Sequence, residues 1–317
     1  MSKPNYLVLG HTGFLGNAVY QRLLSLEFNA LGVSRRTGHD LRSIEVLNNI
    51  LDENKIDIVI NCAAHVGGIS YGIENQDHIF HDNLMLATSL LESLKSRKVK
   101  LINPISNCAY PSKMTVYRES EFWDGPIDSS VLSYGLTRKA LVVGTQAYSK
   151  TGNFRATNIA LPNLYGPGDH LDPVRAHALG GLIYRAIRAK SENDPNLSIW
   201  GTGEPIREWL YIDDAVEAIL RFSKIDDSFE LVNFGSGEGV SVANLAKLIV
   251  EEVGFEGSLS FDKSKLDGAM VKTMEAEHGR TLIKYNPQTE LKNGIAKTVS
   301  WYKSELSKLG IGDSHYN

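Results

Sequence analysis

The first half of the chain alternates short apolar runs with segments in which apolar residues recur every three or four positions. The runs predict strands, and the helical spacing predicts helices between them. Because the strands are apolar along their whole length, they are typical of a parallel sheet covered on both faces. With right-handed crossovers, the pattern predicts a doubly wound α/β fold of the Rossmann type. The expected strands are 6–9, 30–34, 56–60, 99–103 and 154–160, and the expected helices are 14–24, 43–51, 76–94 and 131–150.

The pattern changes past Pro167. Gly and Pro become frequent, and the apolar runs at 197–200 and 231–234 are short and scattered. We therefore expect a dinucleotide-binding Rossmann domain over residues 1–165. Residues 166–317 are expected to form a smaller, mixed α/β lobe that binds the substrate.

Part of the second half is expected to return to the first sheet. These return segments lie at about 213–240 and comprise a helix at 213–223 and a strand near Leu231. Asp213 and Asp214 stand at the start of that helix, and we expect them to cap its N-terminus rather than to act as a catalytic pair.

The composition narrows the class of protein. Of the 317 residues, 42% are hydrophobic and 22% are charged, which excludes a disordered chain. The formal net charge of -4 leaves no excess of basic residues for nucleic acid, and no apolar run is long enough to span a membrane. With only Cys62 and Cys108 as cysteines and no signal peptide, we expect a cytoplasmic protein without disulfides.

Gly10-His-Thr-Gly-Phe-Leu-Gly16 carries glycines at its first, fourth and seventh positions. Such a turn can bring backbone N–H groups and a helix N-terminus to a pyrophosphate. Taken alone, it is equally compatible with a plain tight turn, but here it connects the first expected strand to the first expected helix. We therefore predict dinucleotide binding by Gly10, Thr12, Gly13, Phe14, Leu15 and Gly16.

The second expected strand ends at Ser34-Arg35-Arg36, with no acidic residue before Asp40. NAD enzymes usually place an acid here for the ribose 2′-hydroxyl, whereas an arginine accommodates the 2′-phosphate of NADP. Arg36 therefore favours NADP(H), and we place Asp40 and Leu41 in the same cofactor site. The alternative is that both arginines are ordinary solvated residues.

Several stretches in this order resemble the extended short-chain dehydrogenase/reductase family, whose members include NAD-dependent epimerases and dehydratases. The glycine spacing is that family's form of the fingerprint, and the resemblance runs from Gly10 to about Lys272. Within the family, the chain is most similar to enzymes that epimerise and then reduce a GDP-linked 4-keto-6-deoxy sugar. The matching stretches are Ala63-Ala-His-Val-Gly-Gly-Ile69, Ser106-Asn-Cys-Ala-Tyr-Pro111, Asn163-Leu-Tyr-Gly-Pro167, Trp200-Gly-Thr-Gly203, Arg207-Glu-Trp-Leu-Tyr-Ile-Asp-Asp214 and Asp267-Gly268.

The resemblance implies a catalytic Ser and Tyr that deliver a proton to the alkoxide formed when a ketone accepts a hydride. Ser106 and Tyr134 match. The family places a Lys four residues after the Tyr, but here that position is Arg138 and Lys139 follows it. Arg138 keeps the charge that lowers a tyrosine pKa but cannot release a proton. We expect hydride transfer that works at a reduced rate; the competing interpretation is that only epimerisation or binding remains.

Epimerisation beside a ketone needs a base on one face of the sugar and an acid on the other. The resemblance assigns these roles to Cys108 and His177. Taken alone, the cysteine would be a small core residue and the histidine an ordinary satisfied one. Their occurrence together in matching contexts favours the catalytic interpretation.

The resemblance also implies the remaining cofactor and substrate contacts. Val271 stands where the family usually has an Arg, and this departure leaves a different sugar or nucleotide open. Arginine forks suit a diphosphate, whereas Arg185 as a solvated residue and Trp200 as a core residue are the alternatives. The implied cofactor residues are Ala63, Ala64, His65, Tyr134 and Arg138, and the implied substrate residues are Asn163, His177, Arg185, Trp200, Arg207, Asp267 and Lys272.

The resulting hypothesis is an NADP(H)-dependent epimerase/reductase with a nucleotide-sugar substrate and no metal. The resemblance further implies a homodimer in which helices 76–95 and 131–150 form a four-helix bundle. Two alternatives stay open. One is a nucleotide-sugar 4-epimerase or an epimerase with impaired hydride transfer, and the other is a non-catalytic NADP-binding regulatory subunit.

Overall fold

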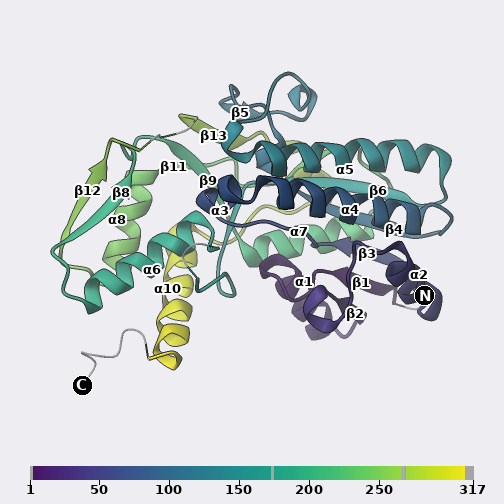
Figure 1. Ribbon diagram of the computed structural model, residues 1–317, viewed down its shortest axis with the longest axis horizontal. Coiled ribbons are helices and arrows are strands. Elements are labelled where there is room, and N and C mark those ends of the chain that lie inside the picture. The colour runs from purple at the N-terminus through teal and green to yellow at the C-terminus, as the bar shows by residue number, and fades with distance from the viewer. Residues whose placement is uncertain (1–2, 173–174, 266, 268, 311–317) are drawn as a thin grey trace.

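The computed structural model describes residues 3–172, 175–265, 267 and 269–310. Its larger part is a six-stranded sheet in the order β2-β1-β3-β4-β6-β10, in which every neighbouring pair is parallel (Figure 1). This arrangement confirms the doubly wound fold. The strands are β1 (Asn5–Leu9), β2 (Asn29–Val33), β3 (Ile58–Asn61), β4 (Lys100–Ser106), β6 (Arg155–Leu161) and β10 (Val232–Asn233).

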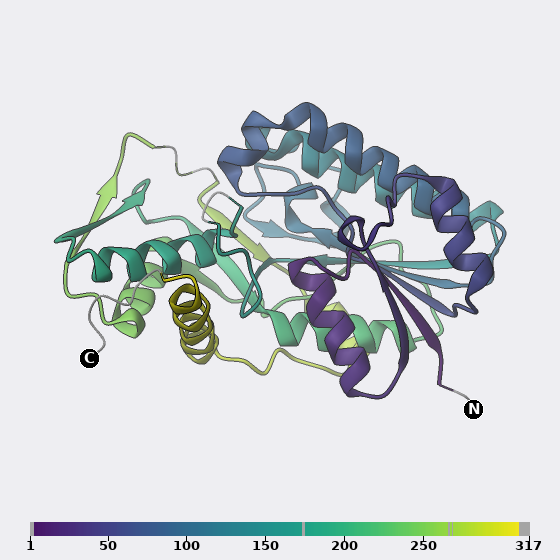
Figure 2. The same cartoon turned by 60° about the horizontal axis from the view of Figure 1, so that its bottom comes forward.

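Helices cover both faces of this sheet, as Figure 2 shows. Successive residues of β1 point to opposite faces, so Leu7 joins one core cluster and Val8 joins the other. Both residues are fully buried, which is why the strands are apolar throughout. One face carries α2 (Ile44–Glu53), α4 (Gln76–Leu94) and α5 (Leu132–Thr151), and the other carries α1 (Phe14–Ser25) and α7 (Ile212–Lys224).

The strand order reverses between β1 and β3, and open α/β sheets bind their ligands at such a point. The loops that leave these two strands touch each other there. A Cβ atom on Gly10 would lie 2.8 Å from the backbone of Ala63, and Gly10 also has a φ of +76°. Only glycine is compatible with both conditions, so this residue allows the two loops to meet.

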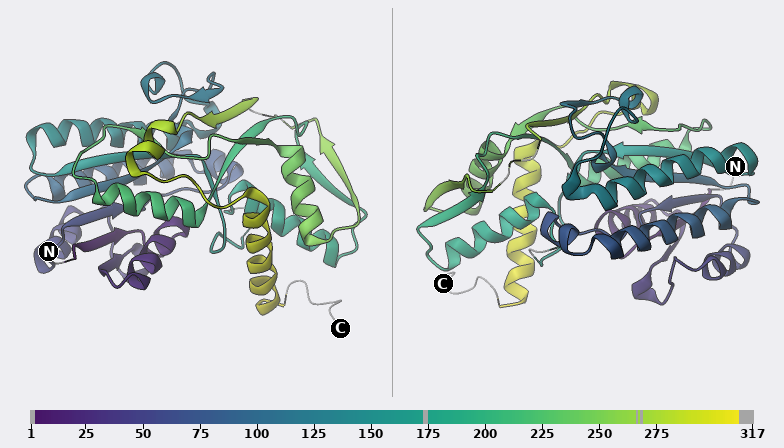
Figure 3. Two further views of the ribbon diagram at one scale, coloured as in Figure 1. Left: turned by 180° about the vertical axis from the view of Figure 1, so that it is seen from behind. Right: turned by 45° about the horizontal axis from the view of Figure 1, so that its top comes forward.

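The smaller part of the molecule contains a mixed sheet in the order β11-β9-β13-β5, with β7 beside β9, and a separate parallel pair, β8 and β12. Three helices pack on one another around Leu179, Ile249 and Val299 (Figure 3). The strands are β5 (Val116–Tyr117), β7 (Asn163–Tyr165), β8 (Asn196–Trp200), β9 (Ile206–Tyr211), β11 (Gly239–Ser241), β12 (Ser258–Asp262) and β13 (Val271–Met274), and the helices are α6 (Ala178–Ser191), α8 (Val242–Val253) and α10 (Leu291–Lys308).

The chain passes between the two parts several times. After β9, α7 packs on the six-stranded sheet and β10 joins its edge beside β6. Short elements complete the chain. They are α3 (Ile69–Glu74), α9 (Glu277–Ile283), and the 3-10 turns η1 (Arg35–Thr37), η2 (Asn107–Ala109), η3 (Glu119–Glu121) and η4 (Ser129–Val131).

The expected capping role of Asp213 and Asp214 is wrong. Tyr211, at the end of β9, is the N-cap of α7, and both aspartates lie in the first helical turn. The Asp214 carboxylate instead accepts hydrogen bonds from the backbone N–H groups of Gln288 (2.8 Å) and Thr289 (3.1 Å). It therefore anchors the segment that leads into α10, far away in the sequence.

In the part of the chain that the structure describes, no helix is both long and apolar enough to cross a bilayer. Within the same residues, no group of three or more His, Cys, Asp or Glu side chains is arranged to hold a metal ion.

Candidate active site

The glycine-rich loop forms a cradle of backbone between β1 and α1. Gly13 donates its N–H to the carbonyl of Gly10 at 2.9 Å, and a Cβ on Gly16 would overlap that same carbonyl. Helix α1 begins at Phe14, and its N-cap, Gly13, provides no side-chain hydrogen bond. The N–H groups of the first turn are therefore open to an anionic ligand, as a pyrophosphate site requires.

The end of β2 contains the next group of expected cofactor residues. Thr12 donates to the hydroxyl of Ser34 at 3.0 Å, which ties the glycine-rich loop to this strand end. Arg35 and Arg36 are both exposed in η1. The side chain of Leu41 is buried in the core cluster, so this residue contributes packing at the site rather than a polar contact.

The carboxylate of Asp40 is already paired. It accepts hydrogen bonds from Arg42 at Nε (2.9 Å) and at Nη2 (2.7 Å). This hydrogen bond with Arg42 holds the pKa of Asp40 below its ordinary value. Asp40 is therefore an ionised partner of Arg42, and its contact with the cofactor stays a prediction.

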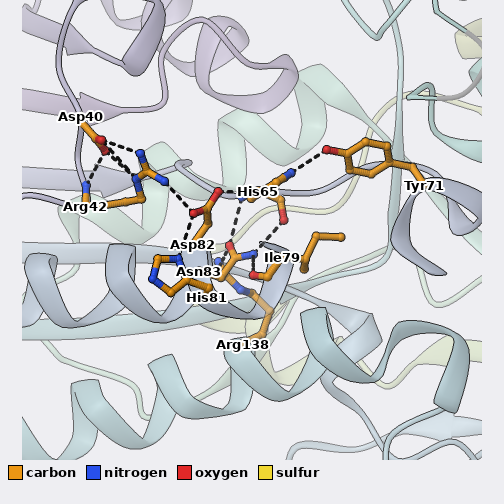
Figure 4. Close-up of polar contacts among 9 residues, drawn as sticks. All are labelled: Asp40, Arg42, His65, Tyr71, Ile79, His81, Asp82, Asn83 and Arg138. Carbon is orange, nitrogen blue, oxygen red and sulfur yellow. Dashed lines mark hydrogen bonds and ion pairs between the residues drawn. The ribbon is translucent and has the colours of Figure 1, made fainter. Parts of the chain in front are cut away.

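His65 lies at the centre of a chain of polar contacts that follows β3 (Figure 4). Its Nδ1 is 2.8 Å from Oδ2 of Asp82, and its Nε2 is 2.7 Å from the phenol oxygen of Tyr71. Asp82 also accepts from Arg42 at 2.7 Å. Burial opposes ionisation of Asp82, but these hydrogen bonds outweigh it and lower its pKa to about 2. Because Asp82 is ionised, Nδ1 of His65 carries a hydrogen.

Asn83 connects the backbone of His65 to the helix that carries the expected catalytic tyrosine. Its Oδ1 accepts from the N–H of His65 at 3.1 Å and from Nη2 of Arg138 at 2.7 Å, and its Nδ2 donates to the His65 carbonyl at 2.8 Å (Figure 4). The loop after β3 and the first turns of α5 are therefore held together by one amide side chain.

Tyr134 and Arg138 lie on one face of α5. The guanidinium carbon is 5.2 Å from the centre of the tyrosine ring. Burial raises the pKa of Tyr134, and the charge of Arg138 opposes that rise. Arg138 is only 3% exposed, and among the described residues its Nε has no hydrogen-bond partner. Lys139 points elsewhere, with its Nζ 5.1 Å from the ring centre of Phe122.

Ser106 is the last residue of β4, and Cys108 lies in the turn η2 that follows it. The Ser106 hydroxyl accepts the N–H of Cys108 at 3.2 Å and so caps η2. A Cβ on Gly135 would lie 2.5 Å from the Cys108 carbonyl. This close approach packs the first turn of α5 directly against η2, so Ser106, Cys108 and Tyr134 come from adjoining backbone segments.

His177 enters from the other part of the molecule. It is the N-cap residue of α6, and its ring centre lies 5.6 Å from that of Phe14, at the start of α1. Burial opposes protonation, but the hydrogen bond and charge of Asp169 outweigh it and raise the pKa of His177. Among the described residues, no contact connects the thiol of Cys108 with this imidazole, so their convergence on one cavity stays a prediction.

Three of the expected substrate residues lie on neighbouring strands of the mixed sheet. Arg207 of β9 pairs in register with Lys272 of β13, and Trp209 of β9 pairs with Asn163 of β7. Residues 207 and 209 share a face of β9, and in-register partners on adjacent strands point the same way. This face therefore presents two cations, an amide and an indole together. Burial lowers the pKa of Arg207.

The other expected substrate residues have structural partners. The Asp267 carboxylate accepts from Thr202 at its N–H (2.7 Å) and its hydroxyl (2.8 Å) and so fastens the 201–203 loop. Arg185 donates to the Ser198 carbonyl at 2.9 Å. Trp200 is 57% exposed and is therefore not a core residue. Leu266 and Gly268, which belong to the same sequence resemblance, lie outside the described residues.

Sequence reasoning missed several residues of this region, including Asp82 and Asn83, which hold His65. Asp169 holds His177 through two contacts. His11 and Trp209 each have a buried ring nitrogen without a partner among the described residues. His11 stands inside the glycine-rich loop, which was a usable signal, whereas nothing in the sequence spacing singles out Asp169 or the indole nitrogen.

Comparison with known proteins agrees with this geometry. The family model described as "NAD dependent epimerase/dehydratase family" matches residues 6–235. "Probable GDP-L-fucose synthase 1" of Oryza sativa subsp. japonica is 33% identical over 298 residues, which cover 93% of this chain and 90% of the relative.

Two solved structures share the fold. A GDP-L-fucose synthetase from Naegleria fowleri bound to NADP superposes with a TM-score of 0.87 at 24% identity and covers 97% of this chain and 96% of that one. A GDP-6-OMe-4-keto-L-xylo-heptose reductase from C. jejuni gives a TM-score of 0.86 at 22% identity, over 96% of this chain and 99% of that one. The matched family model and the similarity along almost the whole length show that the chain belongs to the NAD-dependent epimerase/dehydratase family.

Proposed function

We propose that this protein is an NADPH-dependent epimerase/reductase that converts a GDP-linked 4-keto-6-deoxy sugar by epimerising C3 and C5 and then reducing C4. The observation that carries the proposal is the packing of α5 on η2. A Cβ on Gly135 would lie 2.5 Å from the Cys108 carbonyl, so the turn of α5 that carries Tyr134 packs against the segment that carries Ser106 and Cys108. This combination brings the proton donor for the reduction and the base for the epimerisation into one region.

The residues present fit a dinucleotide. Gly13, the N-cap of α1, has no side chain to cap the N–H groups of the first turn, and the buried Nε of Arg138 lacks a protein acceptor among the described residues. A buried donor without a partner is costly, so a ribose hydroxyl at this point would satisfy it. Arg36, with no free acid at the end of β2, favours the 2′-phosphate of NADP(H).

The reduction needs a hydride, which bound NADPH supplies from its nicotinamide, and a proton, which this chain supplies. When the carbonyl carbon at C4 accepts that hydride, the phenol of Tyr134 would give its proton to the oxygen. Arg138 stabilises the tyrosinate that is left. In this proposal Ser106 holds the carbonyl oxygen by a hydrogen bond from its hydroxyl.

The epimerisation uses the acidity that the C4 ketone gives to the C–H bonds at C3 and C5. Cys108 as thiolate removes the proton from one face, and the protonated imidazole of His177 returns a proton to the same carbon from the other face. Each exchange inverts one centre and leaves the carbonyl group for the later reduction.

The shared face of β7, β9 and β13 supports binding of the nucleotide diphosphate. Arg207 and Lys272 bring two positive charges to neighbouring strands, and a guanidinium suits a diphosphate well. Asn163 lies one row further along the same face. Because Val271 replaces an Arg of the family pattern, a different sugar or a different nucleotide is the second candidate substrate.

A homodimer is part of the proposal. Leu132, Leu136 and Val143 follow each other at helical spacing on α5, and each is between 44% and 50% exposed. Phe80 and Met85 of the adjoining α4 are about as exposed. Such a two-helix apolar surface fits the same surface of a second copy. Light scattering of Val143→Glu tests this: dissociation to monomers is expected, and an unchanged mass would contradict the proposed interface.

The two free thiols, Cys62 and Cys108, favour a reducing compartment such as the cytoplasm. A thiol that serves as a proton-transfer group has to stay reduced to act.

Thermal-shift measurements with NADPH, NADH and GDP-, CDP-, UDP- and dTDP-sugars test the ligands, since a ligand bound only by the folded state raises the melting temperature. NADPH and GDP-sugars are expected to give the largest shifts. NADPH oxidation with GDP-4-keto-6-deoxymannose tests the reaction, and Tyr134→Phe is the matched control that keeps NADPH binding but loses turnover. Tight NADPH binding without turnover of any 4-keto nucleotide sugar would instead indicate a regulatory subunit.

A further inference from the structure

Asp169 holds His177 at two points with one carboxylate. Oδ2 accepts the backbone N–H of His177 at 3.1 Å, and Oδ1 lies 2.8 Å from Nδ1 of the imidazole. A residue bound through its backbone and its ring to the same rigid group has little freedom to rotate. The loop between β7 and α6 thereby fixes the direction of the ring.

The carboxylate is almost completely enclosed. The side chain of Asp169 is 2% exposed, whereas that of His177 is 42% exposed. A Cβ on Gly180, in the first turn of α6, would lie 2.6 Å from Oδ2 of Asp169. The enclosed acid therefore lies behind the histidine, and only the histidine reaches the open side.

The charged and titratable groups around the pair come from several elements. Asp169 also accepts the backbone N–H of His170 at 2.8 Å, and Tyr302 of α10 donates to the His170 carbonyl at 2.9 Å. Burial and the nearby charges of Arg175, His177 and Arg36 lower the pKa of His170, although Asp169 opposes them. The carboxylate of Asp169 therefore favours a charged His177, whereas burial and the neighbouring positive charges favour a neutral His170.

The free edge of the imidazole faces away from the acid. Because Asp169 engages Nδ1, Nε2 lies on the opposite side of the ring, and no described residue hydrogen-bonds to it. The ring also lies 5.6 Å from that of Phe14, beside the glycine-rich loop. Nε2 is thus available to a ligand that reaches between the two parts of the molecule.

We propose that Asp169 is the positioning residue for His177, and that it holds the imidazole so that Nε2 carries the proton delivered to the sugar during epimerisation. The proposal rests on the proposed function. In the step itself, Cys108 takes a proton from a ring carbon beside the ketone, and that carbon receives the Nε2 proton. His177 is left neutral, with its Nδ1 hydrogen still directed to Asp169.

Histidine NMR of the free enzyme tests the pair without any substrate. In protein labelled with ¹⁵N-histidine, the signal of His177 is assigned as the one that is missing from the spectrum of His177→Gln. In its neutral state, His177 is expected to carry its hydrogen on Nδ1. The pKa of His177 is expected to fall in Asp169→Asn. The variant removes the negative charge that raises this pKa, while the burial of the ring, which lowers it, is unchanged. The matched control is Glu256→Gln, an exposed carboxylate of the same lobe. A hydrogen on Nε2 in the wild type, or an unmoved pKa in Asp169→Asn, would overturn the proposal.

The catalytic readout is exchange of the C3 and C5 hydrogens in deuterated water as a function of pH. Exchange falls when His177 loses its proton, so Asp169→Asn is expected to move this fall to lower pH. At about pH 8 its kcat should drop about tenfold to a hundredfold with little change in KM. An unmoved pH profile would overturn the positioning role. Absence of exchange in the wild type would refute the proposed function instead, and the NMR result would still decide the pairing of Asp169 with His177.

Discussion

The guanidinium carbon of Arg138 lies 5.2 Å from the ring centre of Tyr134, one turn along the same helix. Arg138 thus keeps a positive charge beside the phenol, which opposes the rise that burial causes in the Tyr134 pKa. Its side chain is nevertheless held by Asn83 at 2.7 Å, and its buried Nε has no hydrogen-bond partner among the described residues. We therefore propose that the replacement of the family's Lys retains the electrostatic function and changes the hydrogen-bonding function.

Substitutions at Arg138 separate these two functions. Arg138→Met removes the charge, so the pKa of Tyr134 should rise further and hydride transfer should fall by about a hundredfold or more. Arg138→Lys keeps the charge and restores a group that can exchange protons, so NADPH oxidation should become faster than in the wild type. Stopped-flow fluorescence of NADPH measures both, and no turnover in any of the three proteins would defeat this account of the residue.

Gly135 should be required for catalysis through its contact with the Cys108 carbonyl. In Gly135→Ala the new methyl group would lie 2.5 Å from that oxygen, so α5 has to move away from η2. We expect a cost of about 1 to 3 kcal/mol in the free energy of unfolding and a kcat reduced about tenfold or more because Tyr134 is displaced.

Gly144→Ala is the matched control on the same helix, because its Cβ meets only the end of the Leu91 side chain. Urea unfolding and NADPH oxidation of the two variants should differ clearly. Equal kcat values for Gly135→Ala and the wild type would mean that this packing does not position Tyr134.

Arg36 should decide the preference for NADPH over NADH. In Arg36→Ala the dissociation constant for NADPH is expected to rise about tenfold or more, because a charge-assisted contact to the 2′-phosphate is lost, with little change for NADH. Arg35→Ala, in the same exposed turn, provides the control. Fluorescence titration gives all four constants, and a parallel loss for both cofactors would show that Arg36 is an ordinary surface residue.

Asp82 should make stability depend on pH. Its pKa is lowered from 3.8 to about 2 by Arg42, His65 and His81, against the effect of burial. A lowered folded-state pKa stabilises the fold above the ordinary value, and this contribution is lost as the pH falls through about 2. Asp82→Asn should therefore cost about 2 kcal/mol near pH 7 and progressively less below about pH 4.

Urea unfolding at several pH values measures the effect, and Asp77→Asn on the exposed side of the same helix is the control. A cost for Asp82→Asn that stays constant between neutral and acidic pH would contradict the assigned ionisation.

Local patterns predicted the framework of this protein well. The apolar runs correspond to strands of the parallel sheet, and the glycine spacing corresponds to a loop in which Gly10 and Gly16 have no room for a side chain. These features depend on neighbouring residues alone. Packing that joins distant segments was not predictable in the same way, as the pairing of Met274 with Tyr117 illustrates.

Polar side chains were the hardest to assign, because their partners are chosen by the tertiary structure. Asp267 was singled out for a substrate contact, which stays a prediction, and its bond to Thr202 was not foreseen. Asp214 was expected to cap its own helix and instead holds the chain at residues 285–289. No pattern in the sequence indicated a role for Asp169, although it is the direct partner of His177. In a sequence these three carboxylates look alike.

The most direct test of the central claim is mass spectrometry of the product formed from GDP-4-keto-6-deoxymannose and NADPH in deuterated water. If Cys108, His177 and Tyr134 act on one bound sugar, the reduced product carries solvent deuterium at both C3 and C5. Reduced product without deuterium at either carbon, or deuterium exchange without any consumption of NADPH, would contradict the two-step chemistry assigned to this site.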